Sequence, residues 1–136
     1  MSAMSNYTEK KVGEHMLRGV VSTSPGQTWL ALYTSSPGDD NAGTECSFTG
    51  YARQTFGVTP SAAWSSIGVD GRTKNQNTIT FPANAGGSNI VVTHWGIFDA
   101  STGGNLLFHG ALDSSKTLEP TDVLSLPANN LEIEFA

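Results

Sequence analysis

Short apolar runs separated by turn residues constrain the fold of this chain most strongly. From residue 20 onward, stretches with strand character are interrupted by clusters of Pro, Gly, Asp, Asn and Ser, such as residues 36–41, 99–104 and 127–130. Alternating runs bounded by such clusters predict short strands joined by turns. No helical periodicity lies between the strands, which argues against a parallel α/β sheet.

We expect seven or eight strands. Residues 89–99 have the strongest pattern, and Gly103 and Gly104 in the hairpin loop that follows are predicted to adopt positive φ angles. The other predicted strands are residues 28–34, 51–56, 78–81, 106–112, 115–118, 123–126 and 131–135. Alternation along residues 89–99 places Ile90, Val92, His94 and Phe98 on one face, and Val91, Trp95 and Ile97 on the other.

One helix is predicted at the N-terminus, over residues 7–18. Asn6 is a candidate N-cap, Glu9 completes a capping-box pattern, and Gly19 is a C-terminal stop. Thr8, Val12 and Met16 recur every four residues and form a narrow apolar stripe. Such a stripe indicates a helix that lies on a surface, either that of its own domain or that of a partner.

These elements predict a mainly β fold. We expect a single antiparallel β-sandwich or jelly-roll domain over residues 20–136, preceded by a helical arm over residues 1–19. At 14.3 kDa the chain is large enough for one hydrophobic core.

The composition excludes several classes of protein. A hydrophobic content of 38% is too high for a disordered chain, and no apolar run is long enough to span a membrane. Residues 1–11 lack the apolar stretch of a signal peptide. The net charge of −5 argues against nucleic acid and anionic membranes as partners.

Few residues are candidates for a catalytic or metal-binding site. Cys46 is the single cysteine, and His15, His94 and His109 are the candidate bases for a small hydrolase that would use it. His94 and His109 lie on neighbouring predicted strands, but two ligands do not make a metal site. A lone cysteine and half-buried histidines are the simpler interpretation.

Three charged segments also have simple interpretations. Residues 39–45 are rich in oxygen ligands but lack the spacing of an EF-hand, so a solvated turn is favoured over a calcium loop. Residues 70–74 form a short basic loop, and Glu132 with Glu134 are expected on the solvent face of an edge strand. We therefore predict no catalytic residue, cofactor or metal ligand.

Five residues are candidates for a protein interface: Tyr7, Val12, Met16, Arg53 and Trp64. The first three belong to the predicted helix. Trp64 lies in the weakly patterned segment 57–76, where an interface and local packing are equally plausible. Arg53 suits either a bidentate contact to a carboxylate across an interface or an ion pair within the chain. Trp29 and Trp95, by contrast, are expected in the core.

Several strings of residues occur together in an order that resembles a known family. They are Leu30-Ala31-Leu32-Tyr33-Thr34, Pro37-Gly38-Asp39, Gly50-Tyr51-Ala52-Arg53-Gln54, Thr80-Phe81-Pro82, Val92-Thr93-His94-Trp95-Gly96-Ile97-Phe98-Asp99, Thr102-Gly103-Gly104-Asn105-Leu106-Leu107 and Gly110-Ala111-Leu112. Over about residues 5–135 the chain resembles small virion proteins of tailed bacteriophages, often labelled tail fibre proteins and similar to capsid cement proteins.

The resemblance implies a non-enzymatic structural protein of the virion. Capsid cement is the first expectation, with the major capsid protein as partner and a homo-oligomer, dimer or trimer, as the assembled form. A tail fibre or tail-tip component that takes part in host attachment is the alternative, although a fibre usually has a repetitive shaft and this sequence has none. No cofactor, nucleic acid or membrane is expected to bind.

Overall fold

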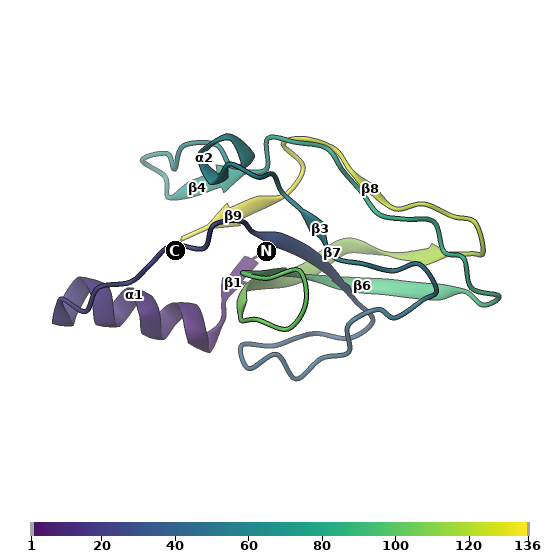
Figure 1. Ribbon diagram of the computed structural model, residues 1–136, viewed down its shortest axis with the longest axis horizontal. Helices are drawn as coiled ribbons and strands as arrows, with labels where there is room; N and C mark the ends of the chain where they lie inside the picture. The colour runs from purple at the N-terminus through teal and green to yellow at the C-terminus, as the bar shows by residue number, and fades with distance from the viewer. Residues whose placement is uncertain (1, 136) are drawn as a thin grey trace.

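The computed structural model describes residues 2–135 and contains nine strands and two helices within them (Figure 1). The helices are α1 (Asn6–Arg18) and α2 (Pro60–Ala63). The strands are β1 (Ser2–Met4), β2 (Trp29–Tyr33), β3 (Gln54–Thr55), β4 (Arg72–Lys74), β5 (Ile79–Thr80), β6 (Ile90–Phe98), β7 (Leu106–Leu118), β8 (Ser125–Leu126) and β9 (Glu132–Glu134).

Five strands form the main sheet, in the order β1-β7-β6-β2-β3, and all of its pairs are antiparallel. The long β6–β7 hairpin is its centre. Residues 99–105 close this hairpin, and Gly103 and Gly104 have φ angles of 59° and 71°, which confirms the prediction for this loop.

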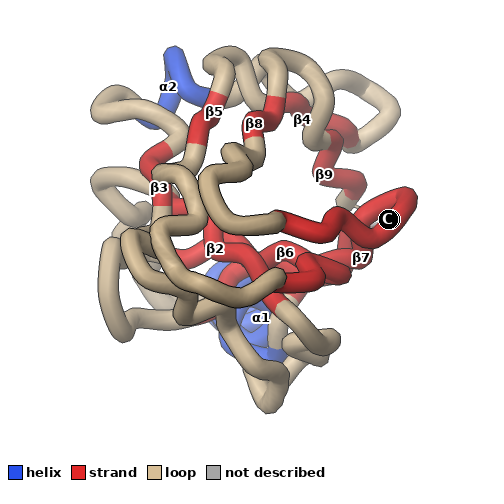
Figure 2. Tube along the Cα trace, turned by 90° about the vertical axis from the view of Figure 1, so that its right-hand side faces the viewer, coloured by secondary structure: helices blue, strands red, loops and turns tan. Residues whose placement is uncertain are grey.

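Two short ribbons, β4–β9 and β5–β8, lie across one face of the main sheet (Figure 2). The main core fills the space between these layers: Leu32 and Trp95 come from the sheet, and Ile79, Phe81 and Ile133 come from the ribbons or their ends. The prediction of a mainly β, sandwich-like fold with a short N-terminal helix is confirmed. The jelly-roll order of strands stays a prediction.

A register shift in the β6–β7 pair corrects the predicted faces of β6. Val92 pairs with Lys116 and His94 with Ala111, so β7 has extra residues at this point, and the alternation of side chains along β6 changes phase there. Val92 consequently lies in the same core cluster as Trp95 and Ile97, on the face predicted to be opposite. Phe98 lies on the other face, in a smaller cluster with Ala31, Tyr33 and Leu106.

The cap of α1 also differs from the prediction. Ser5, not Asn6, is the N-cap: its hydroxyl accepts a hydrogen bond from the Thr8 amide at 3.2 Å and donates one to the Leu106 carbonyl. The Ser5 amide in turn binds the Leu107 carbonyl on β7 at 3.0 Å, which fixes the start of the helix one residue earlier. At the other end Gly19, with φ 68°, ends the helix as predicted.

Three further segments differ from the sequence prediction. Residues 57–76, which are only weakly patterned in the sequence, contain α2 and β4, while the predicted strand 51–56 is reduced to β3. The two strands predicted within residues 106–118 form one continuous strand, β7. The strand β1, which was not predicted, joins the N-terminus to the main sheet beside β7. The division into an arm of residues 1–19 and a domain of residues 20–136 stays a prediction.

Replacing the cap residue tests how the helix is attached. We expect Ser5→Ala to remove about 1 kcal/mol from the stability of α1, and hence to speed exchange of the α1 amides about fivefold, while the β6 amides change little. Native-state hydrogen exchange measures both. Ser101→Ala, at an exposed hairpin residue, is the matched control. Unchanged exchange in α1 would show that the cap does not hold the helix.

Candidate functional site

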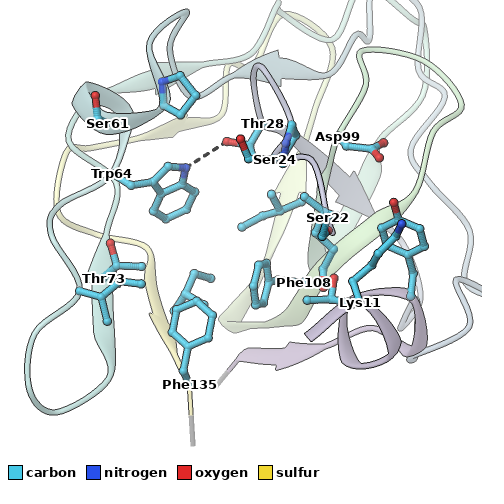
Figure 3. Close-up of a pocket in the computed structure, with 18 of the residues that line it drawn as sticks. Lys11, Ser22, Ser24, Thr28, Ser61, Trp64, Thr73, Asp99, Phe108 and Phe135 are labelled. Carbon is cyan, nitrogen blue, oxygen red and sulfur yellow. Dashed lines mark hydrogen bonds between the residues drawn. The ribbon is translucent and has the colours of Figure 1, made fainter. Parts of the chain in front are cut away.

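An apolar groove lies between α1 and the segment that follows α2. Its cavity volume is about 720 Å³, and its walls include Tyr7, Thr8 and Lys11 of α1, residues 22–25 with Thr28, and residues 60, 61 and 64–67. Figure 3 shows Trp64, Phe108 and Phe135 around its apolar part, with Lys11 and Ser22 on the opposite side. We call this feature the arm groove, and α1 together with residues 19–21 the arm.

The aromatic side chains of the arm groove are held by contacts within the β-sandwich and its loops, residues 22–135, which we call the body. Trp64 donates a hydrogen bond from its indole to the Thr28 hydroxyl at 3.0 Å, and its ring packs on Phe56 with centroids 4.5 Å apart. Phe108 on β7 meets Phe135 edge to face at 5.4 Å. The groove is therefore preformed, with fixed apolar walls.

Polar groups at the groove are mostly uncharged hydroxyls. Lys11 and Asp99 are its two charged lining residues, and the Lys11 ammonium sits 5.6 Å from the centre of the Tyr7 ring. A groove of this kind recognises its occupant through apolar contact and shape, because it offers little charge and no paired nucleophile and base.

The arm itself is almost uncovered. None of the residues of α1 is buried, and Met16 and Leu17 are 73% and 87% exposed. Val12 is 45% exposed. The helix is fixed at its base instead, where the Thr8 hydroxyl donates to the Leu107 carbonyl at 2.9 Å and the Asn6 amide to the Asp39 carbonyl at 2.9 Å.

The structure thus separates the five predicted interface residues into three places. Tyr7 and Trp64 line the arm groove together. Val12 and Met16 lie exposed on the arm and do not line the groove. Arg53 lies at a third place, in an ion pair with Glu45, which is the second of the two roles that the sequence left open for it.

Arg53 is the centre of a buried polar cluster. Its side chain is 8% exposed and makes a bidentate pair with Glu45, at 2.8 and 2.9 Å. Its remaining terminal nitrogen donates to the carbonyls of Ala100 and Gly103 in the hairpin loop, at 3.0 and 2.8 Å. The guanidinium also stacks on Phe98, 3.6 Å from the ring centre.

The ionisation of Glu45 follows from these contacts. Burial by itself would raise the pKa of the carboxyl, but hydrogen bonds from Arg53 and Tyr51 outweigh it and hold the pKa below the ordinary value. Burial raises the pKa of Tyr33 in the same cluster to about 12, with a further contribution from the Glu45 charge. Glu45 and Arg53 are therefore charged together and act as a fixed structural unit.

The residues considered for catalysis do not come together. Cys46 is buried, and burial together with the charge of Glu45 raises the pKa of its thiol to about 11. None of the hydrogen bonds of residues 2–135 links it to a histidine: His15 binds the Val20 carbonyl, His94 the Thr93 hydroxyl and His109 the Asp39 carboxylate. His94 faces Ala111 across the β6–β7 pair, two positions from His109.

The charged segments are also paired internally. Residues 70–74, expected to be a basic loop, contain β4, whose Arg72 and Lys74 contact Glu132 at 2.9 and 3.5 Å. Glu134 contacts Arg72 at 3.3 Å. Within residues 2–135 no three His, Cys, Asp or Glu side chains are grouped so as to hold a metal ion. Neither helix of this range is long and apolar enough to cross a membrane.

Comparison with known families decides the identity of the chain. Residues 3–134 match the family described as podophage GP4 fiber I protein gp80. The chain belongs to this family. Membership confirms the resemblance to tail fibre-type virion proteins and makes the chain a phage virion protein of a structural family. None of the curated proteins matches it.

Sequence reasoning missed the walls of the groove in this fibre family member. Phe108 and Phe135 were assigned to strands without a surface role, and Ile67 was part of a segment that is only weakly patterned. One signal was present: Val58, Ile67 and Val69 are isolated apolar residues in a segment rich in Gly and Ser, and all three are more than half exposed. Of these three, Ile67 lines the groove beside the aromatic side chains, and a contiguous exposed apolar patch of that kind marks an interaction surface.

The depressed pKa of Glu45 makes the contribution of the ion pair to stability depend on pH. We expect Glu45→Gln to lower the free energy of unfolding by about 2 kcal/mol at neutral pH. The pKa of Glu45 is depressed in the folded state, so as the pH falls below 4.5 the carboxyl of Glu45 is protonated in the unfolded wild-type chain first. The free energy of unfolding of the wild type therefore falls with pH, and its difference from that of the Glu45→Gln variant narrows. Urea unfolding at neutral pH and at about pH 3 measures the difference. Glu9→Gln on the arm is the control, and a difference that stays constant with pH would contradict this account.

The burial of Cys46 predicts slow alkylation. At pH 8 a thiol with a pKa of about 11 has about a hundredfold less thiolate than one at the ordinary value of 9.0, and the surrounding core also excludes the reagent. We expect iodoacetamide to leave the native chain unmodified under conditions in which the urea-unfolded chain reacts fully, as mass spectrometry would show. Equal rates in the two states would mean that the thiol is accessible and would reopen the hydrolase hypothesis.

Proposed function

We propose that the chain is a non-enzymatic structural component of a phage fibre, and that its arm and arm groove take part in assembly. The family match over residues 3–134 carries this proposal, since the family is named for a fibre protein. The uncovered arm supports it, because a helix with exposed apolar side chains is of use to a protein that is assembled into a larger particle.

The fold favours a particular place within a fibre. The nine strands form a sandwich-like body without internal repeats, whereas a shaft requires a repeated unit. The chain then serves as a body or joint of the fibre rather than as its shaft. A role in host attachment, by the fibre or the tail tip, is a further prediction of the same proposal.

Capsid cement, with the major capsid protein as partner, is the second candidate. The chain has the neutral, hydroxyl-rich character that suits a large hydrogen-bonded contact with a shell, with only 14% charged residues. The name of the family favours the fibre, so we treat binding to the shell as the alternative that the experiment must separate.

Locating the chain in the particle tests the proposal. An epitope inserted after Gly87 is suitable, because a side chain there would meet nothing within 4 Å and residues 86–88 lie at the end of the body opposite α1 (Figure 1). We expect gold-labelled antibody on purified virions to mark the fibres in electron micrographs. Particles carrying the untagged chain are the control.

The pattern of labelling separates the candidates. Gold confined to the capsid shell would overturn the fibre proposal in favour of cement. A chain that is absent from purified particles by mass spectrometry would overturn both.

A further inference from the structure

The arm presents apolar side chains that its own chain does not cover. Val12 and Met16 are one turn apart, Leu17 follows, and Val21 just beyond the helix is 87% exposed. The charged residues near the tip are neutralised by each other, since Arg18 contacts Glu14 at 2.8 Å. An amphipathic helix with anchors at such spacing is the standard occupant of an apolar groove.

The arm groove offers the matching surface on the same molecule. Its aromatic walls, Trp64, Phe108 and Phe135, are preformed, and Ile67 at its rim is 60% exposed. The arm of the same chain cannot fill it. The first two turns of α1 already form one wall through Tyr7 and Lys11, and the base of the helix is bound to β7 through Ser5 and Thr8.

The chain exposes more area than an average monomer of its mass, by about as much as one interface of standard size with a second copy would cover. The solvent-accessible area is 7569 Å². A monomer of 14.3 kDa is expected to expose roughly 6,800 Å². The excess, roughly 750 Å², is close to the roughly 800 Å² that each partner buries in an interface of standard size.

We propose that the arm of one copy docks in the arm groove of a second copy, with Val12, Met16 and Leu17 against the aromatic walls. Every copy both gives an arm and receives one, so two copies close a dimer by exchange and three close a ring by passing arms in one direction. This contact rests on the proposed structural role only because a structural virion protein acts in several copies. It adds the surface, the arm with the arm groove, and the partner, a second copy of the chain.

Mass in solution tests this directly. We expect the purified wild-type chain to sediment at two or three times 14.3 kDa at micromolar concentration. Met16→Glu on the arm and Ile67→Glu on the rim should each weaken association on the order of tenfold or more, because each buries a charge in an apolar contact. Both positions are exposed in the single chain, so circular dichroism should show an unchanged fold.

Val123→Glu is the matched control, since Val123 is 52% exposed and lines neither the arm nor the groove. It should leave the sedimentation unchanged. A second measurement uses two batches of chain, one with Met16→Cys and one with Ile67→Cys. When they are mixed under oxidising conditions, a disulfide between the two batches is expected, whereas Met16→Cys mixed with Val123→Cys should give none.

Three results would overturn the inference. They are a wild-type chain that is monomeric throughout the concentration range, an oligomer that both glutamate variants leave intact, and an oligomer that responds to Met16→Glu but not to Ile67→Glu. A monomeric chain found on fibres would refute this contact alone and leave the proposed function standing, whereas an oligomer located away from fibres would do the reverse.

Discussion

The ion pair between Arg53 and Glu45 is the contact on which the loops at one end of the sheet depend. A guanidinium that is 8% exposed is tolerated only when its donors are paired, and here the planar group binds Glu45 twice and two carbonyls of the β6–β7 hairpin loop. One side chain thus joins Glu45, eight residues before it, to the hairpin loop 47 to 50 residues after it. Stacking on Phe98 ties the same group to the smaller apolar cluster of the main sheet.

Buried polar side chains perform this task elsewhere in the chain as well. Asn75 is fully buried, binds the carbonyls of Asn77 and Pro127, and accepts from the Leu131 amide, which joins β4 to the approach of β9. Asn84, also fully buried, binds the Leu118 carbonyl at the end of β7. Because loops are fixed by such hydrogen bonds, a chain rich in Ser, Thr, Asn and Gly holds a defined shape with a modest apolar core.

The elements that could be predicted from the sequence are those set by local pattern. Alternation and turn residues located β2 and the β6–β7 hairpin, and the spacing of apolar residues with the Gly19 stop located α1. The register shift between β6 and β7 was not visible, because extra residues on one strand of a pair leave no mark on composition. The groove was missed for another reason: Phe108, Trp64 and Phe135 meet only through the tertiary fold.

The body and the arm differ in what stabilises them, and this difference bears on assembly. The β-sandwich has its own stabilising contacts, since the main sheet and the two ribbons bury a shared apolar core and the buried polar side chains are hydrogen-bonded within it. The helix of the arm, α1, has 13 residues and is held at its first turn by hydrogen bonds, with none of its own side chains buried. Helices of that length are marginally stable in water on their own. An arm of this kind gains order when its apolar face is covered, so folding of the body and engagement of the arm are separate steps, and the second depends on the concentration of partners.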